Sequence, residues 1–164
     1  MSAIPQQQPT EETTLYDDDI VAWAAQQARL LRSGRLSEID IEHIAEEIDD
    51  VGRSEQRELA SRVAVLLAHL IKWQFQPQRR GHSWLTTIRT QRNRIDRRLH
   101  RTPSLKRALE DDDWWADAWD EALDTATRET GIANLPVACP WSPELVLDAN
   151  WLPEAVAASA MPRR

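Results

Sequence analysis

Five side chains that could bind a metal ion or transfer protons lie close together in the first third of the 164-residue chain. Spacings of three and four residues place several of them on one face of a helix. Helix bundles build di-iron sites from such ligands, but that design needs a Glu-x-x-His pair on each of two helices. The chain offers only the Asp40-x-x-His43 pair, so the ligand set is incomplete and we expect no bound metal and no cofactor. The five residues are Asp40, His43, Glu46, Glu47 and Asp50.

His69 is a second imidazole that could take part in catalysis. It follows His43 by 26 residues, which corresponds to about 39 Å along a straight helix at the standard rise per residue. No Asp or Glu lies within four residues of it. An enzyme that uses His43, His69, Glu46 and Glu47 therefore stays an alternative without a complete catalytic constellation. We favour a solvated or ion-paired acidic face, with His69 packed among apolar neighbours.

Basic side chains that could bind phosphate groups are concentrated between residues 72 and 107. This segment has eleven Arg or Lys against one Asp, whereas residues 1–71 carry a net charge of −8 and residues 108–164 one of −9. Six arginines fall on one predicted helix, residues 83–101: Arg89, Arg92, Arg94, Arg97, Arg98 and Arg101. Such clusters bind nucleic acid by neutralising phosphates. In a compact bundle, however, the acidic segments must neighbour the basic one, so we favour internal pairing over nucleic-acid binding.

Eight tryptophans are a high number for a chain of this length. Most of them fall on predicted apolar stripes, which core packing explains. Trp114, Trp141 and Trp151 do not, and indoles outside a core are enriched at binding surfaces. These three residues are therefore candidate binding aromatics.

The cellular compartment is indicated by the single cysteine and by the absence of long apolar runs. Cys139 cannot form an intrachain disulfide, so nothing points to an oxidising compartment. Residues 1–14 lack the apolar run of a signal peptide, and the longest apolar run, residues 63–68, is too short to cross a bilayer. We therefore expect a cytoplasmic protein without a membrane partner.

One long helix, from Ser37 to Gln76, is expected to position most of these residues. Its apolar residues recur at steps of three and four, which is the helical pattern. They are Ile41, Ile44, Ile48, Val51, Leu59, Val63, Leu66, Leu70 and Trp73. At the standard rise per residue this helix is about 60 Å long, so the other elements must pack along it. The sequence leaves open whether it breaks at Gly52.

Shorter helices are predicted on both sides of the long one. The first begins near Tyr16 and ends at Ser33-Gly34. Its apolar face consists of Ile20, Trp23, Ala24 and Leu31, with Gln27 and Leu30 between them. The next is capped by Ser83, another runs from Pro103 to Thr130 with a break at residues 111–113, and a short one opens at Ser142. The fold class is therefore all-α, a bundle of four to six helices organised along one long central helix. We expect a disordered tail (1–14), a single domain (15–154) and a loose tail (155–164).

Arg92 stands on the apolar stripe of helix 83–101, where a leucine would be expected. A buried guanidinium needs a carboxylate, because an unpaired buried charge is strongly destabilising. Glu46 and Glu47 are the predicted partners across an antiparallel contact with the long helix. Such a bidentate pair would fix the register of the two helices.

Seven short motifs follow one another along the chain: Ile44-Ala-Glu-Glu-Ile-Asp49, His69-Leu-Ile-Lys-Trp-Gln74, Trp84-x-x-Thr-Ile88, Ser104-Leu105, Glu129-Thr-Gly131, Cys139-Pro-Trp-Ser142 and Leu152-Pro153. In this order they resemble the bacterial family named domain of unknown function 29. The resemblance covers roughly residues 15–154 and implies a single, almost entirely α-helical domain. It implies no activity. Members of the family often occur in several copies per genome, which suggests an accessory or partner-binding role.

Our leading hypothesis is a non-enzymatic interaction protein, regulatory or antitoxin-like, with an unknown protein partner. The alternatives are a nucleic-acid-associated protein that uses helix 83–101 and the enzyme described above. A homodimer is a further hypothesis. If two long helices paired antiparallel about Gln56, His43 of one copy would lie level with His69 of the other.

Overall fold

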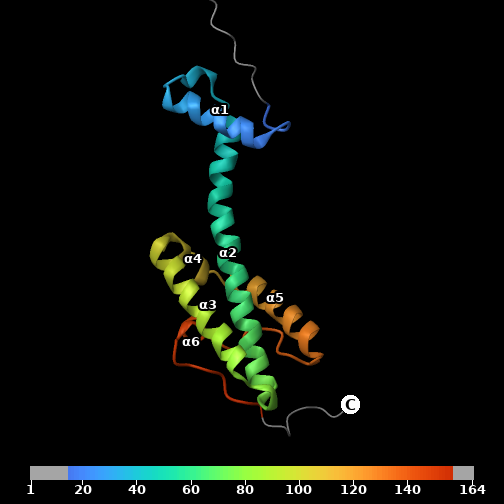
Figure 1. Cartoon of the computed structure of the whole chain (residues 1–164). Coiled ribbons are helices and arrows are strands. Elements are labelled where there is room, and N and C mark those ends of the chain that lie inside the picture. Colours follow the sequence, from blue (N-terminus) through green and yellow to red (C-terminus); the bar gives the residue numbers. More distant parts are fainter. Residues whose placement is uncertain (1–14, 157–164) are drawn as a thin grey trace, which may run out of the picture. The chain divides into compact units, whose positions relative to one another are not determined.

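The computed structural model describes residues 15–156, and this part of the chain contains helices and no strand. Its α-helices are α1 (Ile20–Arg32), α2 (Ile41–Phe75), α3 (His82–Arg101), α4 (Lys106–Leu109), α5 (Asp112–Thr130) and α6 (Pro143–Leu147) (Figure 1). The all-α fold class and the long central helix are therefore confirmed. The predicted tail 1–14 lies outside the described residues, as does the predicted tail 155–164 apart from Ala155 and Val156.

The described helices form two compact units that divide between Gly52 and Arg53. Unit 1 ends at Gly52 and contains α1 and the first part of α2. Unit 2 starts at Arg53 and contains the rest of α2 together with α3 to α6. This division falls inside residues 15–154, for which the sequence predicts one domain. The single domain therefore stays a prediction.

Helix α1 begins at Ile20 and not near Tyr16, because Asp19 is the residue that caps it. The backbone of Asp19 is extended, and its Oδ1 accepts hydrogen bonds from the amides of Val21 and Ala22, both at 3.0 Å. The predicted start was therefore wrong by about one turn. The predicted end is confirmed, since Ser33 caps the helix and Gly34 follows with a positive φ.

The face that α1 buries matches the predicted one only at Trp23, Gln27 and Leu30. Trp23 and Leu30 are buried together with two polar residues, Gln26 and Gln27, whereas Ile20 and Leu31 are exposed. Gln27 is buried because its Oε1 accepts a hydrogen bond from the backbone amide of Asp40, at 2.8 Å. This bond ties α1 to the start of the next helix.

Helix α2 begins at Ile41 and not at Ser37. Residues 36–38 form a 3-10 turn and Ile39 is extended, so the helical backbone starts only after Asp40. Oδ1 of Asp40 accepts a hydrogen bond from the amide of His43, which makes Asp40 the capping residue. The helix then continues without a break through Gly52 and ends at Phe75, before the predicted stop at Pro77.

The apolar stripe of α2 has different surroundings in the two units. In unit 2 its residues are fully buried: Leu59, Val63, Leu66 and Leu70. In unit 1 three of its residues are exposed: Ile41, Ile48 and Val51. The core of the described structure is therefore built on the second half of the helix.

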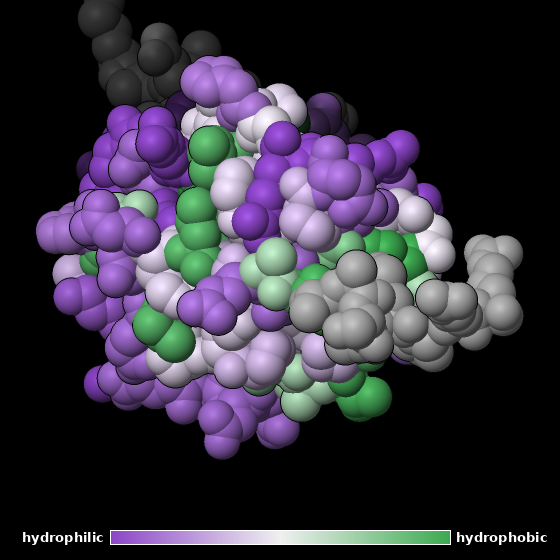
Figure 2. Space-filling model, turned by 90° about the horizontal axis from the view of Figure 1, so that it is seen from below, coloured by the Kyte–Doolittle hydropathy of each residue, from purple (hydrophilic) through white to green (hydrophobic). Residues whose placement is uncertain are grey.

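Helices α3 and α5 run along the second half of α2 and cover its apolar stripe (Figure 1). The predicted stripe of α3 is confirmed at Ile88, Ile95 and Leu99, which are buried in this core. Gly81, rather than Ser83, precedes the first helical residue. Seen from the end where α2 finishes, the surface is mostly hydrophilic, with apolar side chains in separate patches (Figure 2).

Most of the predicted boundaries in the last part of the chain are confirmed, but Pro103 opens a 3-10 turn (Pro103–Leu105) and the α-helix begins only at Lys106. Asp111 interrupts the helix after Pro103 and caps α5, since its Oδ1 accepts from the amides of Asp113 and Trp114. Gly131 ends α5 in the left-handed region with φ +70°. Ser142 caps α6, which places Val146 in the core of unit 2.

Candidate functional site

Three aromatic rings and two carboxylates form a cluster in unit 1. Nδ1 of His43 lies 2.7 Å from Oδ2 of Asp40, and Nε1 of Trp23 donates to the same oxygen at 3.2 Å. The hydroxyl of Tyr16 donates to Oε1 of Glu47, and its ring stacks on that of His43 with centroids 4.2 Å apart. These contacts hold α1 and the turn before it against one side of the first turns of α2.

The hydrogen bonds of this cluster shift the pKa values of its members. The bond to Asp40 raises the pKa of His43, although partial burial opposes the shift, and the same bond lowers the pKa of Asp40. The hydrogen bond to Glu47 raises the pKa of Tyr16 to about 12. An Asp–His pair can serve as a general base toward a hydroxyl, a thiol or a water molecule. In the described structure the His43 ring contacts the Asp40 carboxylate and the rings of Tyr16 and Trp23, while the Tyr16 hydroxyl donates to Glu47 and not to His43.

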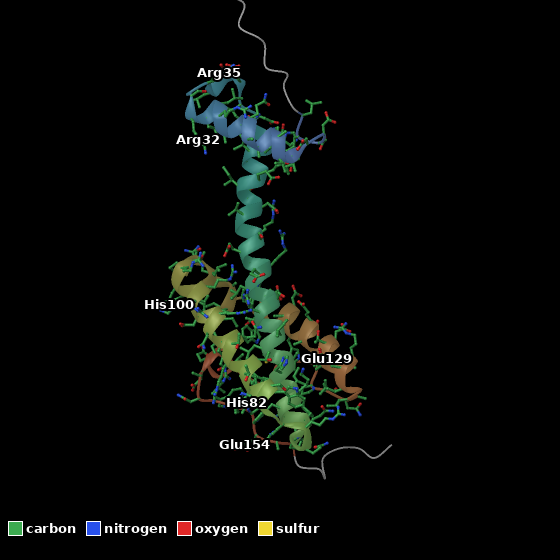
Figure 3. The ribbon with its side chains drawn as sticks, viewed as in Figure 1. Arg32, Arg35, His82, His100, Glu129 and Glu154 are labelled. Atoms are coloured by element: carbon green, nitrogen blue, oxygen red, sulfur yellow. The ribbon has the colours of Figure 1, made fainter. Side chains whose placement is uncertain are left out.

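A second polar cluster surrounds Lys72 in the core of unit 2. Nζ of Lys72 donates to Oε2 of Glu129 at 2.7 Å and lies 3.3 Å from Nε2 of His69 and 5.5 Å from the centroid of the Trp84 ring. Lys72 itself is only 4% exposed. Glu129, labelled in Figure 3, comes from the last turns of α5, and Trp84 comes from α3. One ammonium group therefore links three helices.

Both ring nitrogens of His69 are engaged. Nδ1 lies 2.9 Å from the carbonyl oxygen of Val65, which fixes the proton on that nitrogen and leaves Nε2 to accept from Lys72. Burial lowers the pKa of His69, which favours this neutral form. The structure thus places His69 in one cluster and His43 with Glu47 in another, while Glu46 is exposed.

Arg92 is buried on α3 as predicted, but its predicted partners are wrong. Its Nε donates to the carbonyl oxygen of Val146 at 2.8 Å, and the charge of Asp148 also favours its protonated form. Burial nevertheless lowers the pKa of Arg92. Glu47, one of the predicted partners, accepts from Tyr16 instead. A backbone carbonyl of α6 and the nearby charge of Asp148 therefore take the place of the predicted bidentate carboxylate.

The exposed side of α3 forms the wall of an open groove of about 490 Å³ in unit 2. Its lining consists of Glu55, Arg62, Arg94, Arg97, Arg98, Arg101 and Thr102. Arg89, the other predicted residue of this helix, is exposed and lies outside the lining. The basic segment 72–107 therefore has two kinds of cation, since Lys72 and Arg92 are buried while several arginines border solvent.

The three candidate binding tryptophans pack against the core of unit 2. The Trp141 ring meets the rings of Trp119 and Trp151 edge-on, with centroids 5.6 Å apart in both pairs. Trp114 is partly buried beside Trp115. Packing accounts for these positions, and a role of the three residues in binding stays a prediction.

The described residues contain no group of three or more His, Cys, Asp or Glu side chains placed to hold a metal ion. No described helix is both long and apolar enough to cross a membrane. Cys139 is half-buried, and burial raises the pKa of its thiol. A raised pKa makes a thiol a poor nucleophile.

The comparison with known proteins identifies the family. A family model described as "Domain of unknown function DUF29" matches residues 15–152, which is most of the chain. The chain therefore belongs to this family, as the sequence motifs predicted. No curated protein and no solved structure matches it.

The sequence did not predict the partners of the two polar clusters. The sequence predicts a helix that begins near Tyr16, and no local pattern links Lys72 to Glu129, which is 57 residues away. A signal for the second cluster was nevertheless present, since His69, Lys72, Trp84 and Glu129 all fall in the motifs quoted for the family. Residues from three motifs thus meet at one ammonium group.

We predict that His43 titrates above the ordinary imidazole value of 6.5, because Asp40 stabilises the imidazolium. Its contribution to the stability of unit 1 is then fully present below pH 6.5 and is lost as the pH rises through the raised pKa. Asp40 stabilises unit 1 at pH values above the ordinary pKa of an aspartate. This stabilisation is lost as the pH falls through the lowered pKa of Asp40. NMR titration of the His43 ring proton measures the shift, and Asp40→Asn should abolish it. A midpoint at or below 6.5 in the unmodified protein would contradict the account.

We predict that Arg92→Ala destabilises unit 2 by about 1.5–3 kcal/mol, since it removes a charge-assisted hydrogen bond to a buried carbonyl. Arg94→Ala, at an exposed position of the same helix, should change stability by about 0.5 kcal/mol or less. Urea unfolding of the two variants makes the comparison. Equal midpoints would show that the bond to Val146 does not stabilise the fold.

Proposed function

We propose that the protein is a non-enzymatic interaction protein that presents a bare stripe of α2 to a helix of a protein partner. The stripe, called the α2 seam here, consists of Ile41, Ile44, Ile48 and Val51. Their spacing of three, four and three residues corresponds to alternating a and d positions of a heptad. Such a pattern favours packing against a second helix.

The observation that carries this proposal is the exposure of the seam. Ile41, Ile48 and Val51 are 68%, 66% and 66% exposed, although they stand on a well-formed helix. The contacts from Tyr16 and Trp23 reach α2 at Asp40, His43 and Glu47, on the flank of the seam where Ile44 is half-buried, and they leave the other three seam residues exposed. Exposed apolar surface on a regular element is typical of an interaction site.

The charges beside the seam indicate the kind of helix that would bind. From residue 41 to residue 52 the chain carries five Asp or Glu and no Lys or Arg. A second copy of the same segment would bring like charges together, which is destabilising. An amphipathic helix with apolar residues flanked by Lys or Arg would gain both apolar burial and complementary charge. We therefore favour a basic amphipathic helix of another protein over a homodimer.

An accessory role, regulatory or antitoxin-like, is the kind of role that such a surface would serve. It requires a partner-binding face and no catalytic constellation. The enzyme alternative has less support, because His69 is engaged at both nitrogens and Glu46 is exposed. The nucleic-acid alternative depends on the groove beside α3 and not on the seam.

The experiment uses two designed helical peptides that share Leu and Ile at their a and d positions. One carries Lys and the other Glu at the flanking positions. The peptide with Lys should bind, and added salt should weaken the binding. Ile48→Ser should weaken it by about tenfold or more, because a buried isoleucine contributes more than 1.4 kcal/mol. Val21→Ser is the matched control, since Val21 is equally apolar and 76% exposed on α1.

Fluorescence anisotropy of labelled peptides measures these affinities, and sedimentation of the protein alone reports its oligomeric state. Equal losses for Ile48→Ser and Val21→Ser would remove the seam as the binding surface. A dimer that forms without peptide and dissociates in Ile48→Ser would make a second copy the occupant and contradict the basic-helix proposal.

A further inference from the structure

The groove beside α3 collects more positive charge than the fold neutralises. Its lining has five arginines and one glutamate, so its formal charge is +4. Arg94, Arg97, Arg98 and Arg101 follow one another at spacings of three, one and three residues, which places them along one side of α3. Arg62 faces them from α2, and Thr102 adds a hydroxyl at the end of the helix.

Two of these arginines are held in place by carboxylates of α2. Arg98 donates to Oε2 of Glu55 through Nη1 and lies 3.5 Å from Oε1 of Glu58 through Nη2. Glu58 also pairs with Arg62. These ion pairs fix one wall of the groove. Each guanidinium has five N–H donors, so the ion pairs do not use all of the donors of Arg62 and Arg98.

The other three arginines have no carboxylate partner among the described residues. Arg97 donates through Nε to the backbone carbonyl of Asn93, which leaves its two terminal nitrogens available to a ligand. Arg94 and Arg101 are exposed at the groove. With Glu58 counted, the charge that the fold leaves uncompensated here is +3.

We infer that this groove binds a compact oligophosphate, a ligand with two or three linked phosphate groups. Guanidinium groups bind phosphate oxygens through paired, charge-assisted hydrogen bonds, and several converge here. A single phosphate would neutralise only part of the charge. The volume of about 490 Å³ suits a small molecule.

Two observations favour a compact ligand over nucleic acid. No aromatic side chain lines the groove, so bases would have no ring on which to stack. The chain as a whole carries a net charge of −7, which repels a long polyanion outside the groove. A short oligophosphate interacts with the local positive charge alone.

The inference is tested by isothermal titration calorimetry at about 50 mM salt, where screening is modest. The ligands are inorganic tripolyphosphate, ATP and orthophosphate, and a short DNA duplex is titrated in parallel. Tripolyphosphate and ATP should bind with similar affinity, because only the phosphates are recognised, and orthophosphate should bind about tenfold more weakly or worse. A clear preference for ATP over tripolyphosphate would mean that the base is recognised and would contradict the inference.

The variants separate the groove from the rest of the basic helix. Arg94→Gln should weaken the binding of tripolyphosphate by about tenfold. Arg89→Gln, the same change on the same helix but outside the lining, should leave it within about twofold. The inference is overturned if tripolyphosphate shows no saturable binding up to about 1 mM. It is also overturned if DNA binds more tightly than tripolyphosphate and both variants reduce that binding equally.

Discussion

The structure depends on a single helix whose apolar stripe is covered along only part of its length. Helix α2 has 35 residues, and its second half is buried by α3 and α5 within unit 2. Along its first half, α1 packs on the side of His43 and Glu47. Three residues of the seam, Ile41, Ile48 and Val51, are therefore left exposed. Because buried apolar area is the main stabilising contribution in folding, the uncovered stripe is the observation on which the proposed partner site rests.

Electrostatic pairing explains how the basic segment fits into an acidic chain. Lys72 is buried but has an anionic partner in Glu129, and Arg98 pairs with Glu55 and Glu58. These pairs fix the positions of α3 and α5 along α2, and they account for part of the positive charge. Arg94, Arg97 and Arg101 on the outer side of α3 have no carboxylate partner among the described residues, and the proposed ligand site rests on their charge.

The regular elements could be predicted from the sequence because their signals are local. Capping chemistry predicted helix ends and restarts correctly at Ser33-Gly34, Asp111 and Thr130-Gly131. Three starts were misplaced. At α1 and α2 the sequence offers several capping residues, Asp17 to Asp19 and then Ser37 and Asp40, and only packing selects among them. At α3 the residue before the helix is Gly81, which has no side chain to act as a cap. The partners of Arg92 and Lys72 could not be predicted, since they come from segments 54 and 57 residues away. Periodicity also identified the seam as apolar, but it cannot show whether an apolar stripe is covered.

The most direct test of the central claim is the accessibility of the seam in the monomeric protein. Ile48→Cys and Leu66→Cys, each made in a Cys139→Ser background, place one thiol on the same helix in the two environments. We expect maleimide to label Ile48→Cys at least about tenfold faster than Leu66→Cys, because thiol reactivity follows exposure. The basic helical peptide should slow the labelling of Ile48→Cys. Slow labelling of both variants, with sedimentation showing a monomer, would mean that the chain itself covers the seam and would contradict the account.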